Sequence, residues 1–266
     1  MPVNFPQKQS YEIGDLLRIM ELLRGEGGCP WDREQDHHSI RKNFLEETYE
    51  VLEAIDREDS ELLKEELGDV LLQIVFHCRM ESESGRFDFG DVCDGICRKL
   101  IVRHPHVFGD VTVENSGEVI VNWDQIKRQT KGQNTTTETL KSVPAVLPAL
   151  MRSEKVQHRA AKSGFDYPSL DYAMSDLDSE INELKAAIAE EDQAHIEEEL
   201  GDLLFAAVNV SRFTQTDAEN ALTRSCEKFI ARFEQVENLA VSNGVDMKQA
   251  SIEELDKLWR QAKKRV

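Results

Sequence analysis

The sequence predicts an all-α fold built from two similar halves, and three observations support this. Apolar residues recur three or four positions apart in successive stretches, as they do along one face of a helix. Gly, Pro and polar residues interrupt these stretches at intervals. One acidic pattern occurs twice, half a chain length apart, which indicates a structural repeat.

The first half is expected to begin with an amphipathic helix over residues 11–24, followed by a Gly- and Pro-containing loop over residues 24–32. Two antiparallel helices should follow, joined by a polar turn at residues 56–60 that offers good N-cap residues. Apolar side chains on both helices are expected to form a core-facing stripe. They are Phe44, Leu45, Val51, Leu52, Ile55, Leu67, Val70, Leu71, Ile74 and Val75.

Further helices are expected over about residues 88–103 and 123–128. The first should end at His104, because Pro105 disfavours a helical conformation in the residue before it. Residues 129–143 are polar, Thr-rich and without apolar periodicity, which predicts a linker. Pro144 and Pro148 open a second run of helices. The predicted domains are therefore residues 1–128 and 144–266.

Charge and composition limit the partners of the chain. Its formal net charge of −19 disfavours a nucleic-acid polymer, which would require a basic surface. Five Cys residues in no regular framework fit a reducing compartment. The N-terminal residues contain no apolar signal region, and no apolar run approaches the roughly 18 residues that span a bilayer. We therefore expect a cytoplasmic protein with no membrane partner.

Two acidic pairs lie on the predicted antiparallel helices of the first half. Glu47 and Glu50 are three residues apart, as are Glu66 and Asp69, so each pair shares a helix face. Carboxylates brought together near a buried stripe need a cation, and ligands that are all oxygen suit Mg²⁺ or Mn²⁺. A single Glu-x-x-Glu is more often a solvated helix face, so the assignment depends on further observations.

The repeat provides them. Glu180, Glu183, Glu199 and Asp202 follow the four acids of the first half at one offset of 133 residues. Basic and aromatic residues recur in the same order, as Lys99, Arg103, Trp123 and Lys127 in the first half and Lys228, Arg232, Trp259 and Lys263 in the second. A solvated surface has no reason to keep this order twice, so we predict a metal site in each half.

These residue types point to a phosphorylated ligand. A Lys and an Arg four residues apart on a helix can clamp phosphate oxygens, and Trp can stack on a base. The chain has no P-loop, no dinucleotide-binding fingerprint and no nucleophile paired with His. The most economical chemistry is attack of metal-activated water on a phosphoanhydride.

Several motifs together resemble the MazG family of nucleoside triphosphate pyrophosphohydrolases. They are Gly-Gly-Cys-Pro-Trp-Asp at 27–32, Leu-Glu-Glu-x-x-Glu at 45–50, Glu-Glu-Leu-Gly-Asp at 65–69 and 198–202, Arg-His-Pro-His-Val-Phe at 103–108, Trp-x-Gln-x-Lys at 123–127, Leu-Pro-Ala-Leu-Met-Arg at 147–152 and Gly-Phe-Asp at 164–166. The resemblance implies tandem all-α MazG domains, usually dimeric. It implies Mg²⁺-dependent hydrolysis of nucleoside triphosphates to the monophosphate and pyrophosphate, as in nucleotide-pool sanitation.

The resemblance also assigns roles to residues. The eight acids at the repeated positions would be the metal ligands, with Glu46, Glu47 and Glu180 taking part in catalysis. The two basic and aromatic sets would bind the substrate, with Asp176, Ser179 and Asn209 beside them in the second half.

Neither half matches the family pattern completely. The two adjacent acids of the motif are Glu46-Glu47 in the first half but Ser179-Glu180 in the second. Where a basic residue is common three positions earlier, the halves have Asn43 and Asp176. Seven residues after the last acid stand Phe76 and Asn209, respectively, which favours the second half for substrate binding.

Other functions remain open at this stage. One is a narrow-specificity all-α pyrophosphohydrolase, similar to a dUTPase or a phosphoribosyl-ATP hydrolase. Another is a regulatory helical module that binds Mg²⁺-nucleotide without turnover. A di-iron bundle would need paired Glu-x-x-His motifs, whereas the chain has only Glu34-x-x-His37.

Overall fold

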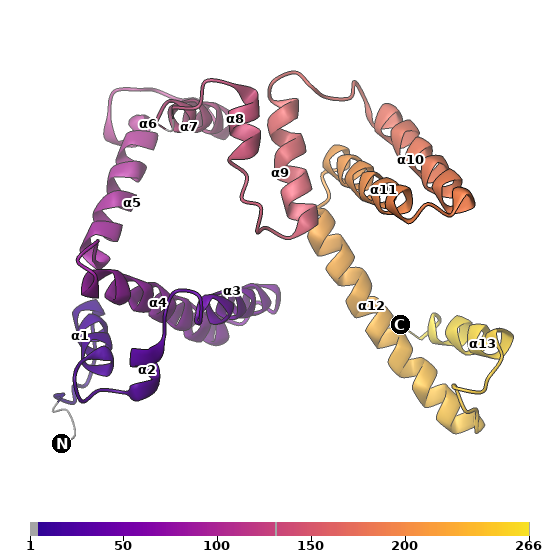
Figure 1. Ribbon diagram of the computed structural model, residues 1–266, viewed down its shortest axis with the longest axis horizontal. Helices are drawn as coiled ribbons and strands as arrows, with labels where there is room; N and C mark the ends of the chain where they lie inside the picture. Colours follow the sequence, from indigo (N-terminus) through magenta and orange to yellow (C-terminus); the bar gives the residue numbers. More distant parts are fainter. Residues whose placement is uncertain (1–4, 131, 266) are drawn as a thin grey trace. The chain divides into compact units, whose positions relative to one another are not determined.

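A computed structural model describes residues 5–130 and 132–265, and in this part of the chain every regular element is a helix (Figure 1). This confirms the prediction of an all-α fold. The helices are α1 (Ile13–Arg24), α2 (Pro30–Glu34), α3 (Arg41–Asp56), α4 (Ser60–Glu83), α5 (Phe89–Arg103), α6 (Pro105–Phe108), α7 (Ser116–Thr130), α8 (Thr136–Lys141), α9 (Ala149–Ala161), α10 (Leu170–Glu190), α11 (Gln193–Phe213), α12 (Ala218–Asn243) and α13 (Ile252–Ala262).

The chain forms two compact units, Met1–Lys127 and Arg128–Val266. Each unit is built around a helical hairpin, α3 with α4 in the first and α10 with α11 in the second. One further helix packs on each hairpin, α1 against α4 and α9 against α11. The two units therefore share one architecture, in agreement with the sequence repeat.

The two hairpins turn in the same way. Glu58 and Glu191 adopt left-handed backbone conformations, with φ of 54° and 56°. The next residue in each half caps the second helix: the side chain of Asp59 accepts hydrogen bonds from the amides of Glu61 and Leu62, and Asp192 accepts the corresponding pair. These caps satisfy amide donors that have no partner inside the helix, so the turn fixes where α4 and α11 begin.

Each unit has a compact apolar cluster. In the first unit, Met20 on α1 and Ile40 before α3 pack with residues of α4, among them Phe76. In the second unit, the ends of α12 and α13 pack through Leu239, Ala240 and Leu258. Both clusters hold helices of their unit against one another.

Three local predictions differ from the structure. The segment 24–32, predicted as a loop, contains the start of α2, because Pro30 suits the first turn of a helix. The predicted helix at 123–128 is part of the longer α7. The predicted linker 129–143 contains α8, which begins with a capping box between Thr135 and Glu138 and buries Thr139.

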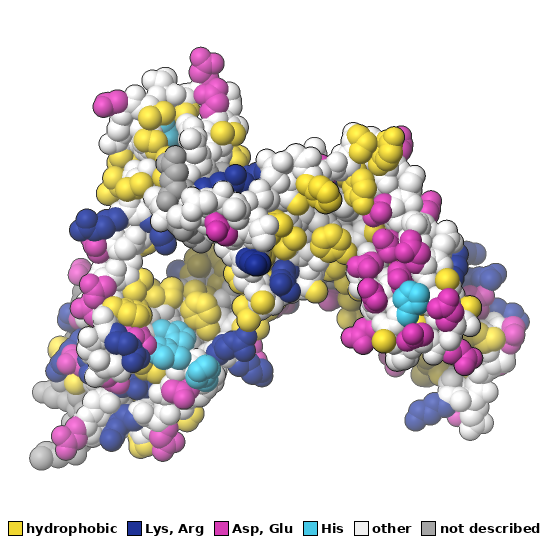
Figure 2. Space-filling view, turned by 45° about the horizontal axis from the view of Figure 1, so that its top comes forward, with side chains coloured by type: hydrophobic (Ala, Val, Ile, Leu, Met, Phe, Trp, Pro, Cys, Tyr) yellow, Lys and Arg dark blue, Asp and Glu magenta, His cyan; other side chains and the backbone are white. Residues whose placement is uncertain are grey.

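The predicted core-facing stripe was wrong for several residues. Leu45, Leu52 and Ile55 on α3 and Leu67 on α4 are about half exposed in the single chain. Corresponding apolar side chains are exposed on the second hairpin, including Leu200 and Leu204. Hydrophobic side chains reach the surface in both units (Figure 2). A two-helix hairpin has more apolar faces than one neighbouring helix can cover.

Candidate active site

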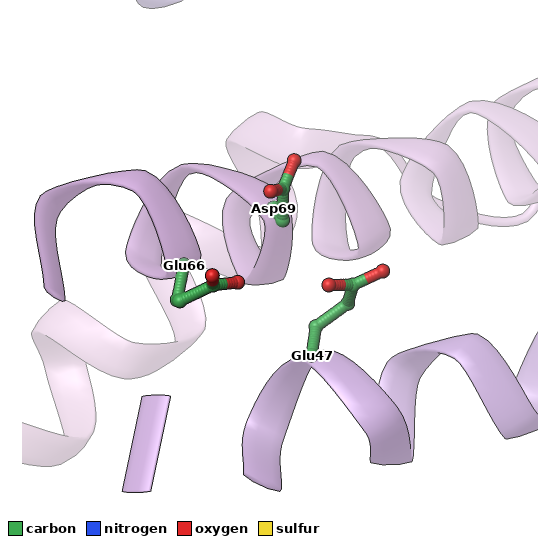
Figure 3. Close-up of side chains that lie close together, drawn as sticks. All are labelled: Glu47, Glu66 and Asp69. Atoms are coloured by element: carbon green, nitrogen blue, oxygen red, sulfur yellow. The ribbon is translucent and has the colours of Figure 1, made fainter. Parts of the chain in front are cut away.

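The first acidic cluster lies in the middle of the α3–α4 hairpin. Glu47 of α3 faces α4, where Glu66 and Asp69 occupy one face, three residues apart (Figure 3). One carboxylate oxygen from each of these residues lies within 4.8 Å of the others. The structure thus brings together three of the four acids predicted for this half.

Mutual repulsion and loss of water are visible in the pKa values of this cluster. Burial raises the pKa of Glu47, and the charges of Asp69 and Glu50 raise it further. Burial likewise raises the pKa of Glu66, with a second contribution from Glu50. Glu50 therefore lies close enough to interact with both side chains, although its oxygen is outside the three-residue group.

The second cluster repeats this arrangement on the α10–α11 hairpin. Glu180 of α10 meets Glu199 and Asp202 of α11, again with one oxygen of each within 4.8 Å of the others. Burial raises the pKa of Glu180, as does the charge of Glu183. Glu183 itself accepts a hydrogen bond of 2.8 Å from the hydroxyl of Ser179. Glu183, like Glu50 in the first half, lies outside the three-residue group.

Both clusters suit a small divalent cation. Oxygens on opposite sides of an ion bound at 2.0–2.1 Å are about 4 Å apart, which is compatible with oxygens that all lie within 4.8 Å of one another. The donors are carboxylates only, the ligand type that Mg²⁺ and Mn²⁺ prefer. The raised pKa values of Glu47, Glu66 and Glu180 show that a positive charge between these groups would relieve an unfavourable interaction.

Glu46, predicted to help in catalysis, lies beside the first cluster. Its side chain is about half exposed and forms an ion pair of 2.9 Å with Lys42 on the same helix. It is not part of the three-residue group. Its role in orienting or deprotonating water stays a prediction.

The sequence analysis missed a histidine beside the second cluster. His195 Nε2 lies 3.0 Å from Glu199 Oε1, and its other ring nitrogen lies 3.4 Å from Glu190. Side chains in this position orient a metal-ligating carboxylate. The spacing of four residues between His195 and Glu199 on one helix was the available signal. A comparison of the two halves does not reveal it, because the first half has Leu62 at the corresponding position.

The predicted phosphate-binding residues form small groups of their own. In the first half, the guanidinium of Arg103 lies 5.3 Å from the ring centre of Trp123, and His104 packs edge-on against the same ring. In the second half, Trp259 lies between Phe229 of α12 and Lys263. No described contact joins these groups to the acids, so the substrate-binding roles of Lys99, Arg103, Trp123, Lys127, Lys228, Arg232, Trp259 and Lys263 remain predictions.

A cavity of about 590 Å³ opens beside the second cluster. Its lining includes the acids Glu180, Asp202 and Asp176 and apolar side chains such as Val156 and Ala206. Its volume lies within the range of small-molecule sites. The cavity also contains Asn209, which the sequence had marked as a substrate contact.

An ion pair closes one wall of this cavity. Arg212 on α11 holds Asp166 with both terminal nitrogens of its guanidinium group, one at 2.9 Å, and donates a further hydrogen bond of 2.9 Å to Asn209 Oδ1. The loop containing Phe165 and Asp166 is thereby tied to the helix that carries Glu199 and Asp202. Sequence analysis noted this Gly-Phe-Asp motif but gave it no role.

The structure is thus an all-α protein with two clusters of carboxylates on paired helices, each able to hold a metal ion and one of them lining a cavity. Comparison with known proteins agrees. Residues 35–108 and 169–237 each match the model of the MazG nucleotide pyrophosphohydrolase domain. The chain belongs to this family, and the two matches include the two acidic clusters.

Full-length relatives carry names consistent with this. The chain is 47% identical to a protein of Escherichia coli K12 named nucleoside triphosphate pyrophosphohydrolase, over 95% of this chain and 97% of that protein. It is 41% identical to the nucleoside triphosphate pyrophosphohydrolase/pyrophosphatase MazG of Thermotoga maritima, over 94% of each chain. A protein of Mycolicibacterium smegmatis with the first of these names is 35% identical over 70% of this chain and 59% of its own length.

Proposed function

We propose that this nucleoside triphosphate pyrophosphohydrolase works mainly from its second half. Substrate would bind as a complex with Mg²⁺ or Mn²⁺ between α10 and α11 and be hydrolysed to the nucleoside monophosphate and pyrophosphate. The observation that carries this proposal is the continuity of the Glu180–Glu199–Asp202 cluster with a cavity large enough for a nucleoside.

The chain's own residues would divide the work. Glu180, Glu199 and Asp202 would hold the cation, with Glu183 joining them after it leaves Ser179. His195 would keep Glu199 in its orientation. A bound Mg²⁺ supplies positive charge to phosphate oxygens and makes a coordinated water more acidic. The first-half cluster of Glu47, Glu50, Glu66 and Asp69 would bind the same ion in the same way.

A matched pair of substitutions tests which half is active. Glu180→Gln and Glu47→Gln make the same change at equivalent places, 133 residues apart. We expect Glu180→Gln to lower pyrophosphate release at least about 100-fold, since a metal contributes several kcal/mol to transition-state stabilisation. Glu47→Gln should retain most of the activity. Full activity in both variants and in the double variant would refute the metal-site assignment.

The proposed substrate is a broad range of ribo- and deoxyribonucleoside triphosphates, consistent with a role in cleaning the cytoplasmic nucleotide pool. Pyrophosphate and orthophosphate should be measured separately over a panel of such substrates, with and without Mg²⁺. Release of orthophosphate alone would contradict the proposed reaction. Activity on a single triphosphate would favour the narrow-specificity alternative.

The protein is also proposed to be a homodimer, since the hairpins expose apolar side chains that one chain leaves uncovered. Leu52 on α3 and Leu204 on α11 are both about half exposed, and helices of this kind usually complete a four-helix arrangement. Equilibrium sedimentation should give about twice the chain mass of 30.4 kDa. A monomer at micromolar concentration would refute this proposal.

None of the helices in the described part of the chain combines the length and the hydropathy needed to cross a bilayer.

A further inference from the structure

Gln157 occupies an unusual position in the cavity beside the second acidic cluster. It lies on α9, lines the cavity, and is only 5% exposed. Its side-chain nitrogen donates a hydrogen bond of 2.7 Å to the backbone carbonyl of Phe205. Its side-chain oxygen is buried and has no hydrogen-bond partner among the described residues.

A buried amide oxygen without a partner destabilises the folded protein, because it has lost its hydrogen bonds to water. The bond to Phe205 also fixes which end of the amide is which, because only the nitrogen can donate to a carbonyl. The oxygen is thus held as an acceptor on the side of the amide away from α11. Such a group is suited to a ligand that brings an N–H donor.

The rest of the cavity restricts the kind of ligand. Aromatic side chains, Phe165 and Phe205, line it together with the aliphatic Val156, and aromatic rings stack well on flat heterocycles. The acids Glu180 and Asp202 belong to the same lining. A ligand that matches this lining has a phosphate group that reaches the acids through a cation and a planar, N–H-bearing ring beside Gln157.

The first half differs at the equivalent position. The residue 133 positions before Gln157 is Arg24, on the helix that packs against α4. Its guanidinium lies 5.2 Å from the ring centre of Phe76, itself the counterpart of Asn209, and pairs with Glu83 at 2.9 Å. The Arg24 side chain is only 8% exposed. The first half thus has a charged side chain, and not an amide, 133 positions before Gln157.

Building on the proposed function, we infer that Gln157 is a specificity-determining residue of the second half. Its side-chain oxygen accepts a hydrogen bond from an N–H group of the nucleobase, while Phe165 and Phe205 contact the faces of the ring. The first half, with Arg24 against Phe76, has no equivalent acceptor at this position.

Methylated substrates test this inference. Among UTP with N3-methyl-UTP and ATP with N6,N6-dimethyl-ATP, the wild-type protein should favour the unmethylated member of its preferred pair by about 10-fold or more in kcat/KM. Gln157→Met removes the acceptor at similar size, so the preference should fall to about 2-fold or less.

Gln73→Met is the matched control. Gln73 lies in α4 of the first half, is buried, and also has an unpartnered side-chain oxygen, but it does not line the cavity. This variant should behave as the wild type. Calorimetric binding of the corresponding monophosphates without metal gives a second readout that does not depend on turnover, and thermal unfolding shows whether each variant folds.

The outcomes separate this inference from the proposed function. If the wild type releases pyrophosphate but Gln157→Met keeps the full preference, the role of Gln157 is wrong and the proposed function stands. Absence of any preference in the wild type has the same meaning. If the folded wild type releases no pyrophosphate from any triphosphate with Mg²⁺, the proposed function itself fails.

Discussion

The hydroxyl of Ser179 donates a 2.8 Å hydrogen bond to Oε1 of Glu183, one turn along α10. In the first half Glu46 stands where Ser179 stands, and Glu50 interacts with Glu47 and Glu66. The fourth acid of the second half thus has a hydroxyl partner on its own helix, where the first half has the carboxylate of Glu46 at that position.

Replacing Ser179 should release the fourth acid. In Ser179→Ala, Glu183 no longer has to break a hydrogen bond before it reaches the cation, so the Kd for Mg²⁺ should fall by about 2- to 5-fold. Isothermal calorimetry on the nucleotide-free protein measures this. A weaker affinity would mean instead that the hydroxyl supports Glu183 as a ligand, and Ser175→Ala on the same helix serves as the control.

Removing one charge from the second cluster should stabilise the metal-free protein. The pKa of Glu180 is raised in the folded state, by burial first and by the charge of Glu183 second. A raised carboxyl pKa means that ionisation costs stability as the pH rises above the unfolded value. Glu180→Gln should therefore raise the Tm in EDTA at pH 7.5 by about 1 to 4 °C.

Mg²⁺ should reverse the order of the Tm values of the wild type and the Glu180→Gln variant. Millimolar Mg²⁺ should raise the Tm of the wild type through preferential binding to the folded state, and raise that of the Glu180→Gln variant less. Differential scanning fluorimetry with Ca²⁺-free buffers provides the comparison. Equal shifts in both proteins would place the ion elsewhere.

The ionic group formed by Glu81, Arg86 and His37 in the first half should make the free energy of unfolding depend on pH. Hydrogen bonds from Arg86 chiefly, and from His37, hold the pKa of Glu81 at about 2. Because this pKa is depressed, the stabilisation is present above about pH 4.5 and is lost as the pH falls towards 2. Glu81→Gln should unfold at lower urea concentration than the wild type at pH 7, and the gap should narrow below pH 4.5.

The neighbouring His77 checks the cause of that effect. Its ring stacks on His37, with the two Nδ1 atoms 2.7 Å apart, and burial lowers its pKa. His77→Phe removes the Nδ1 contact with His37. It keeps an aromatic ring for stacking and leaves the Arg86–Glu81 pair in place. It should retain the wild-type response below pH 4.5, and a lost response would assign the effect to the histidine pair.

The bond between Arg212 and Asp166 should matter for substrate binding more than for chemistry. Arg212→Lys keeps the charge but loses the two-nitrogen grip on the carboxylate. The loop at 164–167 should loosen, and the KM for triphosphates should rise about 5- to 20-fold with kcat changed less than about 3-fold. The double variant with Asp166→Asn should be no worse than the single one, as expected for residues that act through one contact.

The fold was predictable where local patterns decide it. Capping residues and apolar periodicity predicted the two helices of each hairpin. The three-residue spacing predicted that each pair of acids shares a helix face, and the 133-residue offset predicted the same arrangement in the second half. The predictions were wrong where tertiary contacts decide. α8 has no apolar period, yet its Thr139 carbonyl accepts a hydrogen bond from Arg159 on α9. Leu52 fits a core-facing pattern but is exposed in the single chain.

The site was only partly predictable for a related reason. Glu180, Glu199 and Asp202 could be predicted because carboxylates recur in both halves at a fixed spacing. Gln157 carries no such signal, since a glutamine on an amphipathic helix usually faces water. Its proposed role depends on a hydrogen bond to Phe205, 48 residues away in the chain. Only the folded structure shows that the side-chain oxygen of Gln157 has no hydrogen-bond partner among the described residues.

The left-handed residues at Glu58 and Glu191 have a consequence for how this chain can change. One added residue in either turn would rotate the helix behind it by about 100° about its own axis, so that α4 or α11 would present a different face to its partner helix. Insertions should therefore not be tolerated at these two corners. The length of each turn sets which face the following helix presents, so a one-residue insertion would separate the clustered carboxylates while leaving every acid in the sequence.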